Sequence, residues 1–319
     1  MQVFLVTIAL LLSLCNLAAA AEKYPSQRIT VIAPFAPGSG TDGVARIVFQ
    51  RLSELLKTTI VIDNRVGANG ALGATAAARS APDGYTLLIG GTSTHAANPS
   101  LLKSIQYDPV ADFAPISQLG LFPYFLIIDP TLPVKDVADL VALAKSKPGT
   151  LTFGYANALG QLSGEVFKRR AGIDIAAVPY RNSPQVITDI IAQRVSMTFT
   201  DMTPAVAQVE AGTARALATT NPERASLFPQ IPTMKEGGVA FINISAWTGF
   251  FAPKDTPPEI VAKLAESVRE VMGDPEIRRR LAEIGFEAKW VGTAEFAKHV
   301  KSDMELWAAT TKEAGIERQ

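Results

Sequence analysis

Short apolar segments alternate with longer amphipathic ones along this 319-residue chain. Arg28–Ala33 predicts a strand, and a Pro/Gly loop then leads into Asp42–Lys57, where apolar residues recur at helical spacing. The same order follows in strand Thr59–Asp63, helix Gly70–Ser80 and strand Tyr85–Gly90. This strand–helix rhythm predicts a parallel sheet with helices on both faces.

A second series of the same kind begins with a strand at Tyr124–Ile128. The elements expected after it are helix Val134–Lys147, strand Leu151–Tyr155, helix Leu162–Ala171, strand Ala177–Tyr180, helix Ser183–Ala192, strand Ser196–Thr200, helix Thr203–Ala211 and strand Arg215–Thr219. The last third predicts a strand at Ser245–Pro253 and then helices at Pro258–Met272, Pro275–Ile284 and Thr293–Ala314. The fold class is therefore α/β, with two mostly parallel sheets flanked by helices.

The order of these elements predicts two lobes, with the chain leaving the first, building the second and returning. We expect the crossings near Ser117–Pro123 and Thr220–Ala225. They divide the chain into lobe 1 (residues 22–121 and 225–319) and lobe 2 (residues 122–224). Two α/β lobes around a cleft are the usual geometry for hinge closure on a small ligand.

Residues 3–14 form an apolar run that ends in the small residues Ala18–Ala21. This pattern predicts a secretory signal peptide over residues 1–21, because the run is too short to span a bilayer comfortably; a buried N-terminal element is the alternative. Leu14 precedes Cys15, where a lipoprotein signal needs a small residue. We therefore expect an exported chain without a lipid anchor.

Cysteine usage and charge exclude several classes of function. Cys15 is the only cysteine, so the exported part would carry no disulfide, thiol nucleophile or cysteine metal site. Lys plus Arg and Asp plus Glu both number 30, which argues against a nucleic-acid surface and a polybasic membrane contact. No second long apolar run follows the first, so we expect no membrane span.

The loop between the first strand and the first helix is a candidate anion site. Backbone amides in the first turn of a helix lack intrahelical partners and lie at the positive end of its dipole, which suits a carboxylate or a phosphate. Two glycines let the main chain approach a ligand closely. An ordinary turn capped by Thr41 or Asp42 is the alternative. The candidate residues are Phe35, Pro37, Gly38, Ser39, Gly40, Thr41 and Asp42.

Three further polar loops follow predicted strands, where ligands of α/β sheets tend to bind. They offer hydroxyl, amide and backbone donors without a dense basic cluster, which suits reversible binding of a carboxylate; turn chemistry is the alternative for each loop. Their candidate residues are Thr92, Ser93, Thr94 and His95, then Asn157, Gly160 and Gln161, and finally Asp201.

The sequence offers little catalytic chemistry. His299 lies among lysines on a charged helix, and no second histidine or carboxylate stands at metal-ligand spacing to His95, so no metal or cofactor is expected. The Gly-x-Ser-x-Gly, Walker and Gly-x-Gly-x-x-Gly patterns are absent from the loop after the first strand. An exported enzyme that acts on a carboxylate, with His95 as base, remains an alternative.

Eight segments carry a resemblance to a known family: Tyr24–Pro25 with Arg28–Ile32, Pro34–Asp42, Val61–Gly70, Pro82–Leu88, Tyr107–Pro115, Val178–Arg181, Trp247–Pro253 and Trp307–Ile316. These segments resemble the tripartite tricarboxylate transporter substrate-binding proteins, TctC or Bordetella uptake gene (Bug) type. They occur in the same order as in that family and cover nearly the whole chain after residue 21.

This resemblance implies a monomeric periplasmic receptor with the two-lobed Venus-flytrap fold of periplasmic binding proteins. Such a receptor captures a small organic acid (a di- or tricarboxylate, an aromatic acid or an amino acid) and delivers it to a two-component membrane permease. An exported sensor for a kinase is the alternative within binding proteins. The resemblance implies a carboxylate held between the Phe35–Asp42 and Asn157–Gln161 loops through backbone amides and waters, with residues 92–95, Asp201 and Trp247 at the same cleft.

The chain departs from the family pattern at three places. Ser39 replaces the second glycine of the first loop, and the second loop, Asn157–Leu162, lacks the usual Gly/Ser-rich stretch and histidine. Ala246 stands where a serine is common. We expect Leu159 to make the pocket more apolar and the second loop to set ligand identity.

Overall fold

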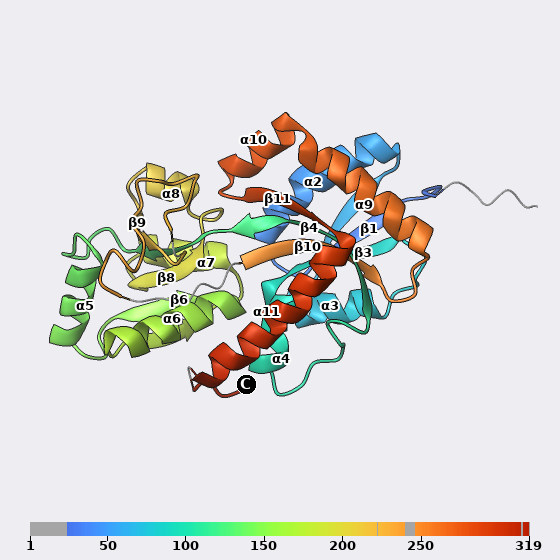
Figure 1. Ribbon diagram of the computed structural model, residues 1–319. Coiled ribbons are helices and arrows are strands. Elements are labelled where there is room, and N and C mark those ends of the chain that lie inside the picture. The colour runs from blue at the N-terminus through green and yellow to red at the C-terminus, as the bar shows by residue number, and fades with distance from the viewer. Residues whose placement is uncertain (1–23, 222, 240–245, 314, 319) are drawn as a thin grey trace, which may run out of the picture.

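The described part of the computed structural model, residues 24–318 without 222, 240–245 and 314, forms two α/β lobes that lie side by side (Figure 1). The expected signal peptide, residues 1–21, lies outside the described residues. No helix in the described part is both long and apolar enough to cross a membrane.

Lobe 1 is built on a six-stranded sheet, counted over the described residues. Its strand order is β11 (Glu287–Gly292), β4 (Phe113–Phe122), β10 (Ala246–Pro253), β3 (Thr86–Gly91), β1 (Ile29–Ala33) and β2 (Ile60–Asn64). β1 runs parallel to β2 and β3, whereas β10 runs antiparallel to both β3 and β4. The central strands are buried and rich in β-branched and aromatic residues, which favours a sheet covered on both faces.

The helices of lobe 1 cover this sheet (Figure 1). They are α2 (Gly40–Leu56), η1 (Ala68–Gly70), α3 (Ala71–Ala78), the π-helical turn η2 (Ser93–Ala97), α4 (Asn98–Leu101), α9 (Pro258–Gly273), α10 (Pro275–Glu283) and α11 (Thr293–Glu313). In α2, Val44, Val48 and Leu52 recur at helical spacing and are fully buried against the sheet. This packing fixes the direction in which the first turn of α2 points.

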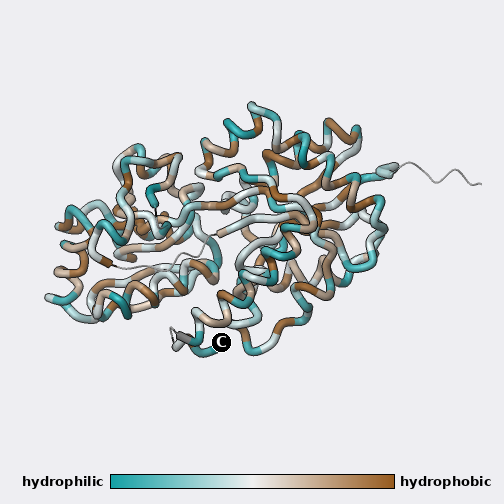
Figure 2. The backbone as a smooth tube through the Cα atoms, in the orientation of Figure 1, coloured by the Kyte–Doolittle hydropathy of each residue, from teal (hydrophilic) through white to brown (hydrophobic). Residues whose placement is uncertain are grey.

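Lobe 2 contains a five-stranded sheet, again counted over the described residues, in the order β7 (Ala176–Pro179), β6 (Thr152–Tyr155), β8 (Met197–Asp201), β5 (Tyr124–Ile128) and β9 (Arg215–Thr219). Its helices are α5 (Val137–Ser146), α6 (Ala158–Ala171), α7 (Ser183–Ile191) and α8 (Val206–Glu210). Alternate residues of β5 enter two apolar clusters, Leu126 with α5 and α6 and Phe125 with α7, so both faces are buried. Figure 2 shows hydrophobic and hydrophilic colours alternating along the helices of both lobes.

The two sheets are mixed, which corrects the expectation of mostly parallel sheets. β5 is antiparallel to β8 and β9, and β10 is antiparallel to its two neighbours. The expectation also missed two strands. β4 contains Pro115 and Gly120, residues that strands disfavour, and β11 is a polar edge strand that pairs only with β4 among the described residues.

The return from lobe 2 to lobe 1 lies further along the chain than expected. Ala225 and Ile231 are buried in the cluster that contains Phe125, and Met234 and Val239 are buried in the cluster that contains Leu126. Residues 225–239 therefore belong to lobe 2, and the boundary at 224/225 is wrong. The polar run after β9 resembles a linker in sequence, but its isolated apolar residues pack against the second sheet.

The lobes contact each other directly around the cleft. Leu159 and Leu162 of α6 in lobe 2 enter the same apolar cluster as the core of lobe 1. The Thr203 hydroxyl donates to the carbonyl of Ile284 at 2.8 Å, and the Ser226 hydroxyl donates to Glu287 Oε1 at 2.9 Å. These contacts describe a closed arrangement of the two lobes.

Candidate functional site

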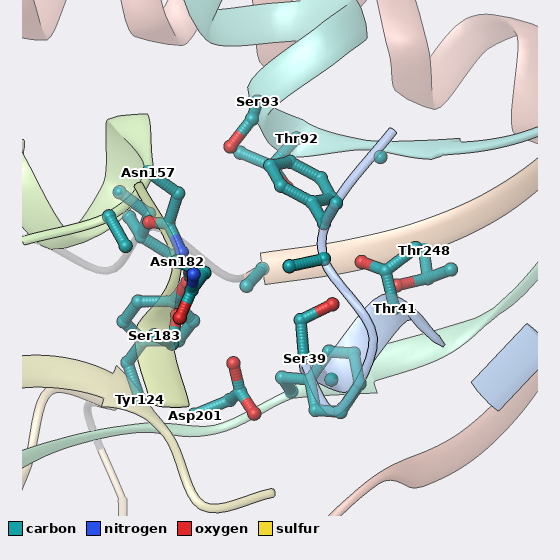
Figure 3. Close-up of a pocket in the computed structure, with 18 of the residues that line it drawn as sticks. Ser39, Thr41, Thr92, Ser93, Tyr124, Asn157, Asn182, Ser183, Asp201 and Thr248 are labelled. Carbon is teal, nitrogen blue, oxygen red and sulfur yellow. Dashed lines mark hydrogen bonds between the residues drawn. The ribbon is translucent and has the colours of Figure 1, made fainter. Parts of the chain in front are cut away.

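A cavity with an empty volume of about 600 Å³ lies between the lobes (Figure 3). Lobe 1 contributes Phe35, Ala36, Ser39, Gly40, Thr41, Gly91, Thr92, Ser93, Phe122, Ala246, Trp247 and Thr248, and lobe 2 contributes Tyr124, Ala156, Asn157, Leu159, Arg181, Asn182, Ser183 and Asp201. Most of these residues lie at the ends of strands or the starts of helices. The wall is rich in hydroxyl and amide groups and carries one acid and one base.

The start of α2 forms one wall of the cavity. Ser39 caps the helix: its hydroxyl accepts from the amide of Asp42 at 3.4 Å, and its carbonyl accepts the first helical bond, from Gly43. The amides of Gly40 and Thr41 have no hydrogen-bond partner among the described residues. A ligand in the cavity therefore meets two free donors at the positive end of the helix dipole.

The start of α6 forms the facing wall in the same way. Asn157 caps this helix: its Oδ1 accepts from the amide of Gly160 at 2.9 Å, and its carbonyl accepts from Gln161. The amides of Ala158 and Leu159 are left without a partner in the described structure. The Asn157 Nδ2 donates to the Tyr124 hydroxyl at 2.9 Å, which holds the cap against β5.

A third helix, α7, also begins at the cavity. Its cap, Asn182, accepts from the amide of Gln185 at 2.9 Å, and Asn182 and Ser183 both line the cavity. Three helices from two lobes thus direct their N-terminal ends to one space. Each such end favours negative charge, so the arrangement favours an anion held between the lobes.

Asp201 brings a carboxylate to this otherwise anion-binding space, and Figure 3 shows it pointing between Tyr124 and Ser39. Burial raises the pKa of Asp201, although hydrogen bonds from Thr203 act in the opposite direction. Burial and the nearby Asp201 carboxylate also raise the pKa of Tyr124, which keeps the phenol neutral. A neutral Asp201 can donate a hydrogen bond to an anion, whereas an ionised one repels it.

Trp247 lines the cavity from β10, and two hydrogen bonds fix its position. Its backbone amide donates to the Thr92 hydroxyl at 3.0 Å, and its indole Nε1 donates to Asp303 Oδ2 of α11 at 2.7 Å. Burial raises the pKa of Asp303 to about 6, against the hydrogen bond from the indole, which lowers it. The floor of the cavity is therefore tied to α11.

No group of three or more His, Cys, Asp or Glu side chains arranged to hold a metal ion occurs among the described residues. Apart from Asp201 and Arg181, the wall offers hydrogen-bond donation by neutral groups and helix amides. Such groups can hold a carboxylate reversibly, because they supply direction without a permanent ion pair.

The family model described as the tripartite tricarboxylate transporter family receptor (TctC) matches residues 44–316. The chain belongs to this receptor family. A protein encoded in the ttuE–ttuC′ intergenic region of Agrobacterium vitis is 35% identical over 93% of this chain and 87% of its own length. BugT of Bordetella pertussis is 32% identical over 98% of this chain and 97% of its own length.

Similar proteins of solved structure have the same fold. A Rhodopseudomonas palustris protein solved with adipate is 34% identical, with a TM-score of 0.90 over 93% of this chain and all of its own. MatC of Rhodopseudomonas palustris, solved with malate, is 30% identical, with a TM-score of 0.83 over 90% of this chain and 99% of its own. The α/β periplasmic-binding-protein fold predicted from the sequence is thereby confirmed.

The structure brings nine of the sixteen predicted site residues of this receptor to the cavity wall: Phe35, Ser39, Gly40, Thr41, Thr92, Ser93, Asn157, Asp201 and Trp247. Leu159 and Ala246, named as departures from the family pattern, also line it. Seven predicted residues do not line it: Pro37, Gly38, Asp42, Thr94, His95, Gly160 and Gln161. Of these, Gly38, Gly160 and Gln161 hold the two loops through their backbone amides, which donate to Asp42 and Asn157.

Asp42 supports the start of α2 from behind. Its carboxylate accepts hydrogen bonds from the Gly38 amide, from Arg46 and from Asn64. Burial alone would raise the pKa of Asp42, but these hydrogen bonds together lower it, so the side chain is an anion bound to its own loop. The sequence places Asp42 next to the site residues, but it did not indicate that the Asp42 side chain points away from the cavity.

His95 is fully buried below the cavity. Its ring stacks on Phe251 with a centroid distance of 3.8 Å, and its Nδ1 lies 2.8 Å from the Thr94 hydroxyl. Burial lowers the pKa of His95 to about 3, so the ring is neutral. The alternative in which His95 acts as a base on a ligand has no support in this geometry.

Several lining residues were missed by the sequence analysis. Tyr124, Arg181, Asn182 and Ser183 come from lobe 2, and Phe122 and Thr248 come from lobe 1. Asn182 stands directly before the predicted helix Ser183–Ala192, and Pro184 lies in its first turn, which is a typical signal for a helix start. That signal could have found Asn182 and Ser183; Tyr124 and Phe122 depend on tertiary structure.

Proposed function

We propose that this receptor is exported to the periplasm, captures a small organic acid between its lobes and delivers it to a two-component membrane permease. The observation that carries the proposal is the convergence of three helix starts, from α2, α6 and α7, on one cavity between the lobes. One ligand carboxylate would accept hydrogen bonds from the free amides of α2 and α6. Because these amides belong to different lobes, ligand binding would stabilise the closed arrangement.

The similar proteins solved with adipate and malate support a carboxylate as the ligand. The balanced charge of the chain and the neutral donors of the wall are consistent with reversible capture followed by release. We propose binding without chemical conversion, because the wall offers a carboxylate and a neutral phenol but no histidine, cysteine or lysine among its described residues.

Native mass spectrometry of the protein from the periplasm, with attention to a co-purified small acid, would identify the ligand. Calorimetry with that acid should give saturable binding, with the acid recovered unchanged. Conversion of the acid to a product would overturn the receptor mechanism. Small-angle scattering should show a more compact particle with the acid than without it, and identical curves would contradict lobe closure.

A further inference from the structure

A second interlobe cavity adjoins the first, with an empty volume of about 1240 Å³. Phe35, Ala156 and Arg181 line both cavities, so the two spaces meet at these three residues. The walls beyond them carry the apolar side chains of Pro34, Val66 and Leu102 beside polar groups of the backbone and of Asn69. A ligand anchored at the helix starts therefore has room to extend past Arg181.

Arg181 is the one cation among the described residues that line either cavity. In the described structure it forms no ion pair or side-chain hydrogen bond, and Asp201, the one acid of the first wall, is not paired with it. By contrast, Arg194 of the same lobe lies 3.1 Å from Asp189. A guanidinium without a partner, facing two cavities, is available to an anionic group of a ligand.

The backbone on either side of Arg181 is fixed. The Tyr180 amide donates to the Tyr155 carbonyl at 2.8 Å, and the Tyr180 hydroxyl donates to Asp189 at 2.9 Å. On the other side, Asn182 caps α7 through its hydrogen bond from Gln185. The position of Arg181 at the junction thus follows from β7 and α7, although its own side chain is exposed.

We propose that Arg181 forms a second anion subsite and that the receptor selects dianions whose acidic groups are joined by an apolar spacer. One carboxylate lies at the helix starts, the spacer passes Phe35 and Ala156, and the second acidic group binds the guanidinium. This inference rests on the proposed function, because it needs the first carboxylate to be anchored between the lobes. The inference adds to the proposed function the charge of the ligand and the residue that recognises this charge.

Calorimetry with straight-chain diacids of four to eight carbons, each paired with its half-amide, tests the subsite. In the unsubstituted protein at least one diacid should bind about tenfold more tightly than its half-amide, which corresponds to about 1.4 kcal/mol. Arg181→Gln should bring that pair to within threefold and change the half-amide itself less than threefold. In Arg181→Lys the preference for the diacid should lie between those of the unsubstituted protein and Arg181→Gln, because lysine keeps the charge and loses the bidentate geometry.

Arg194→Gln is the matched control, because it removes one positive charge from the same lobe outside both cavities; it should leave the preference unchanged. Equal affinity for diacid and half-amide, or an equal loss of both in Arg181→Gln, would overturn the subsite while leaving the carboxylate receptor intact. If no member of the series binds at all, both the subsite and the proposed function fail for this class of acid.

Discussion

The two lobes present the same backbone feature to the cleft but build it with different residues. In lobe 1 the cap of α2 is weak, at 3.4 Å from Ser39 to the Asp42 amide, and Gly38 and Gly40 add no side chain to the loop. In lobe 2 the cap of α6 is strong, at 2.9 Å, and Asn157 also bonds Tyr124. The first wall depends on missing side chains, whereas the second depends on a particular one.

This difference shows how one carboxylate site can serve several ligands. A wall of backbone amides and glycine recognises the charge of a carboxylate and little else. A wall with Asn157, Leu159 and Arg181 adds hydrogen bonds, apolar surface and charge that differ among acids. We therefore expect lobe 1 to anchor the ligand and lobe 2 to select it.

The largest effect is expected at Gly40 of the anchoring wall. A Cβ there would lie 2.8 Å from Asp201 Oδ1 across the cleft and 2.8 Å from Phe122 Cζ. Gly40→Ala should hold the lobes apart and weaken acid binding by about 100-fold, measured by calorimetry. Gly273→Ala, at a helical glycine with open space around it, is the control. Unchanged affinity in Gly40→Ala would mean that binding does not require this close approach.

The caps of α2 and α6 test the comparison directly. Asn157→Ala removes a cap and the hydrogen bond to Tyr124, so it should weaken binding about tenfold. Ser39→Ala removes only the long cap bond and should change the affinity less than threefold. Asp136→Ala, at the cap of α5 away from the cavity, controls for lost stability. Equal losses in Asn157→Ala and Ser39→Ala would remove the distinction between the two walls.

The same contrast explains how much could be predicted from the sequence. The α2 start was found because a strand, two glycines and an amphipathic helix stand together within residues 28–56. The α6 helix was expected from Leu162 but begins at Ala158. Asn157 is a preferred cap residue, but Gly160 in the first turn is a poor helix former and placed the expected start later. Local turn chemistry is visible in sequence, whereas a cap held by Tyr124 depends on a residue 33 positions away.

Long-range pairing also limits what sequence patterns reveal about the fold. The alternation of strands and helices predicted both lobes, but not the antiparallel return of β10 between β3 and β4. His95 was expected at the cleft because it follows a strand, yet the π-helical turn Ser93–Ala97 directs its ring onto Phe251. The direction of the His95 side chain depends on this turn, and the residues of the turn did not indicate its π-helical conformation.

Asp201 offers a smaller effect of opposite sign, because it is the acid of lobe 2 that faces the helix start of lobe 1. Asp201→Asn removes its repulsion of the ligand and should strengthen acid binding roughly threefold to fivefold at pH 8. Since burial raises the pKa of Asp201, the native side chain takes up a proton as the pH falls. The advantage of Asp201→Asn should therefore shrink as the pH falls.

Asp129→Asn is the matched control for Asp201→Asn. Asp129 is also buried in lobe 2 and accepts from the amide two residues later, that of Thr131, but it lies outside the cavity. Asp129→Asn should leave the affinity for the acid unchanged at pH 8 and at lower pH. Weaker binding in Asp201→Asn at pH 8 would show instead that the ionised carboxylate accepts a hydrogen bond from the ligand.

The smallest effect concerns stability behind the anchoring wall, at Asp303. Its pKa of about 6 in the folded protein lies above its ordinary value of 3.8, so the folded state binds more protons than the unfolded state between these values. This group therefore adds stability as the pH falls through about 6 and loses it as the pH rises. Relative to Asp303→Asn, the native protein should gain a few °C in Tm between pH 7.5 and pH 5.

Thermal unfolding followed by tryptophan fluorescence measures this difference, because the carboxylate bonds the indole of Trp247. The two proteins are compared at each pH, because the lowered pKa of Asp42 makes the stability of both fall as the pH falls, which is opposite to the effect of Asp303. Glu305→Gln, at an exposed acid of the same helix, should show no such change with pH. A native-minus-variant difference in Tm that stays constant from pH 7.5 to pH 5 would show that Asp303 does not carry the proton, and that the floor of the cavity is insensitive to pH.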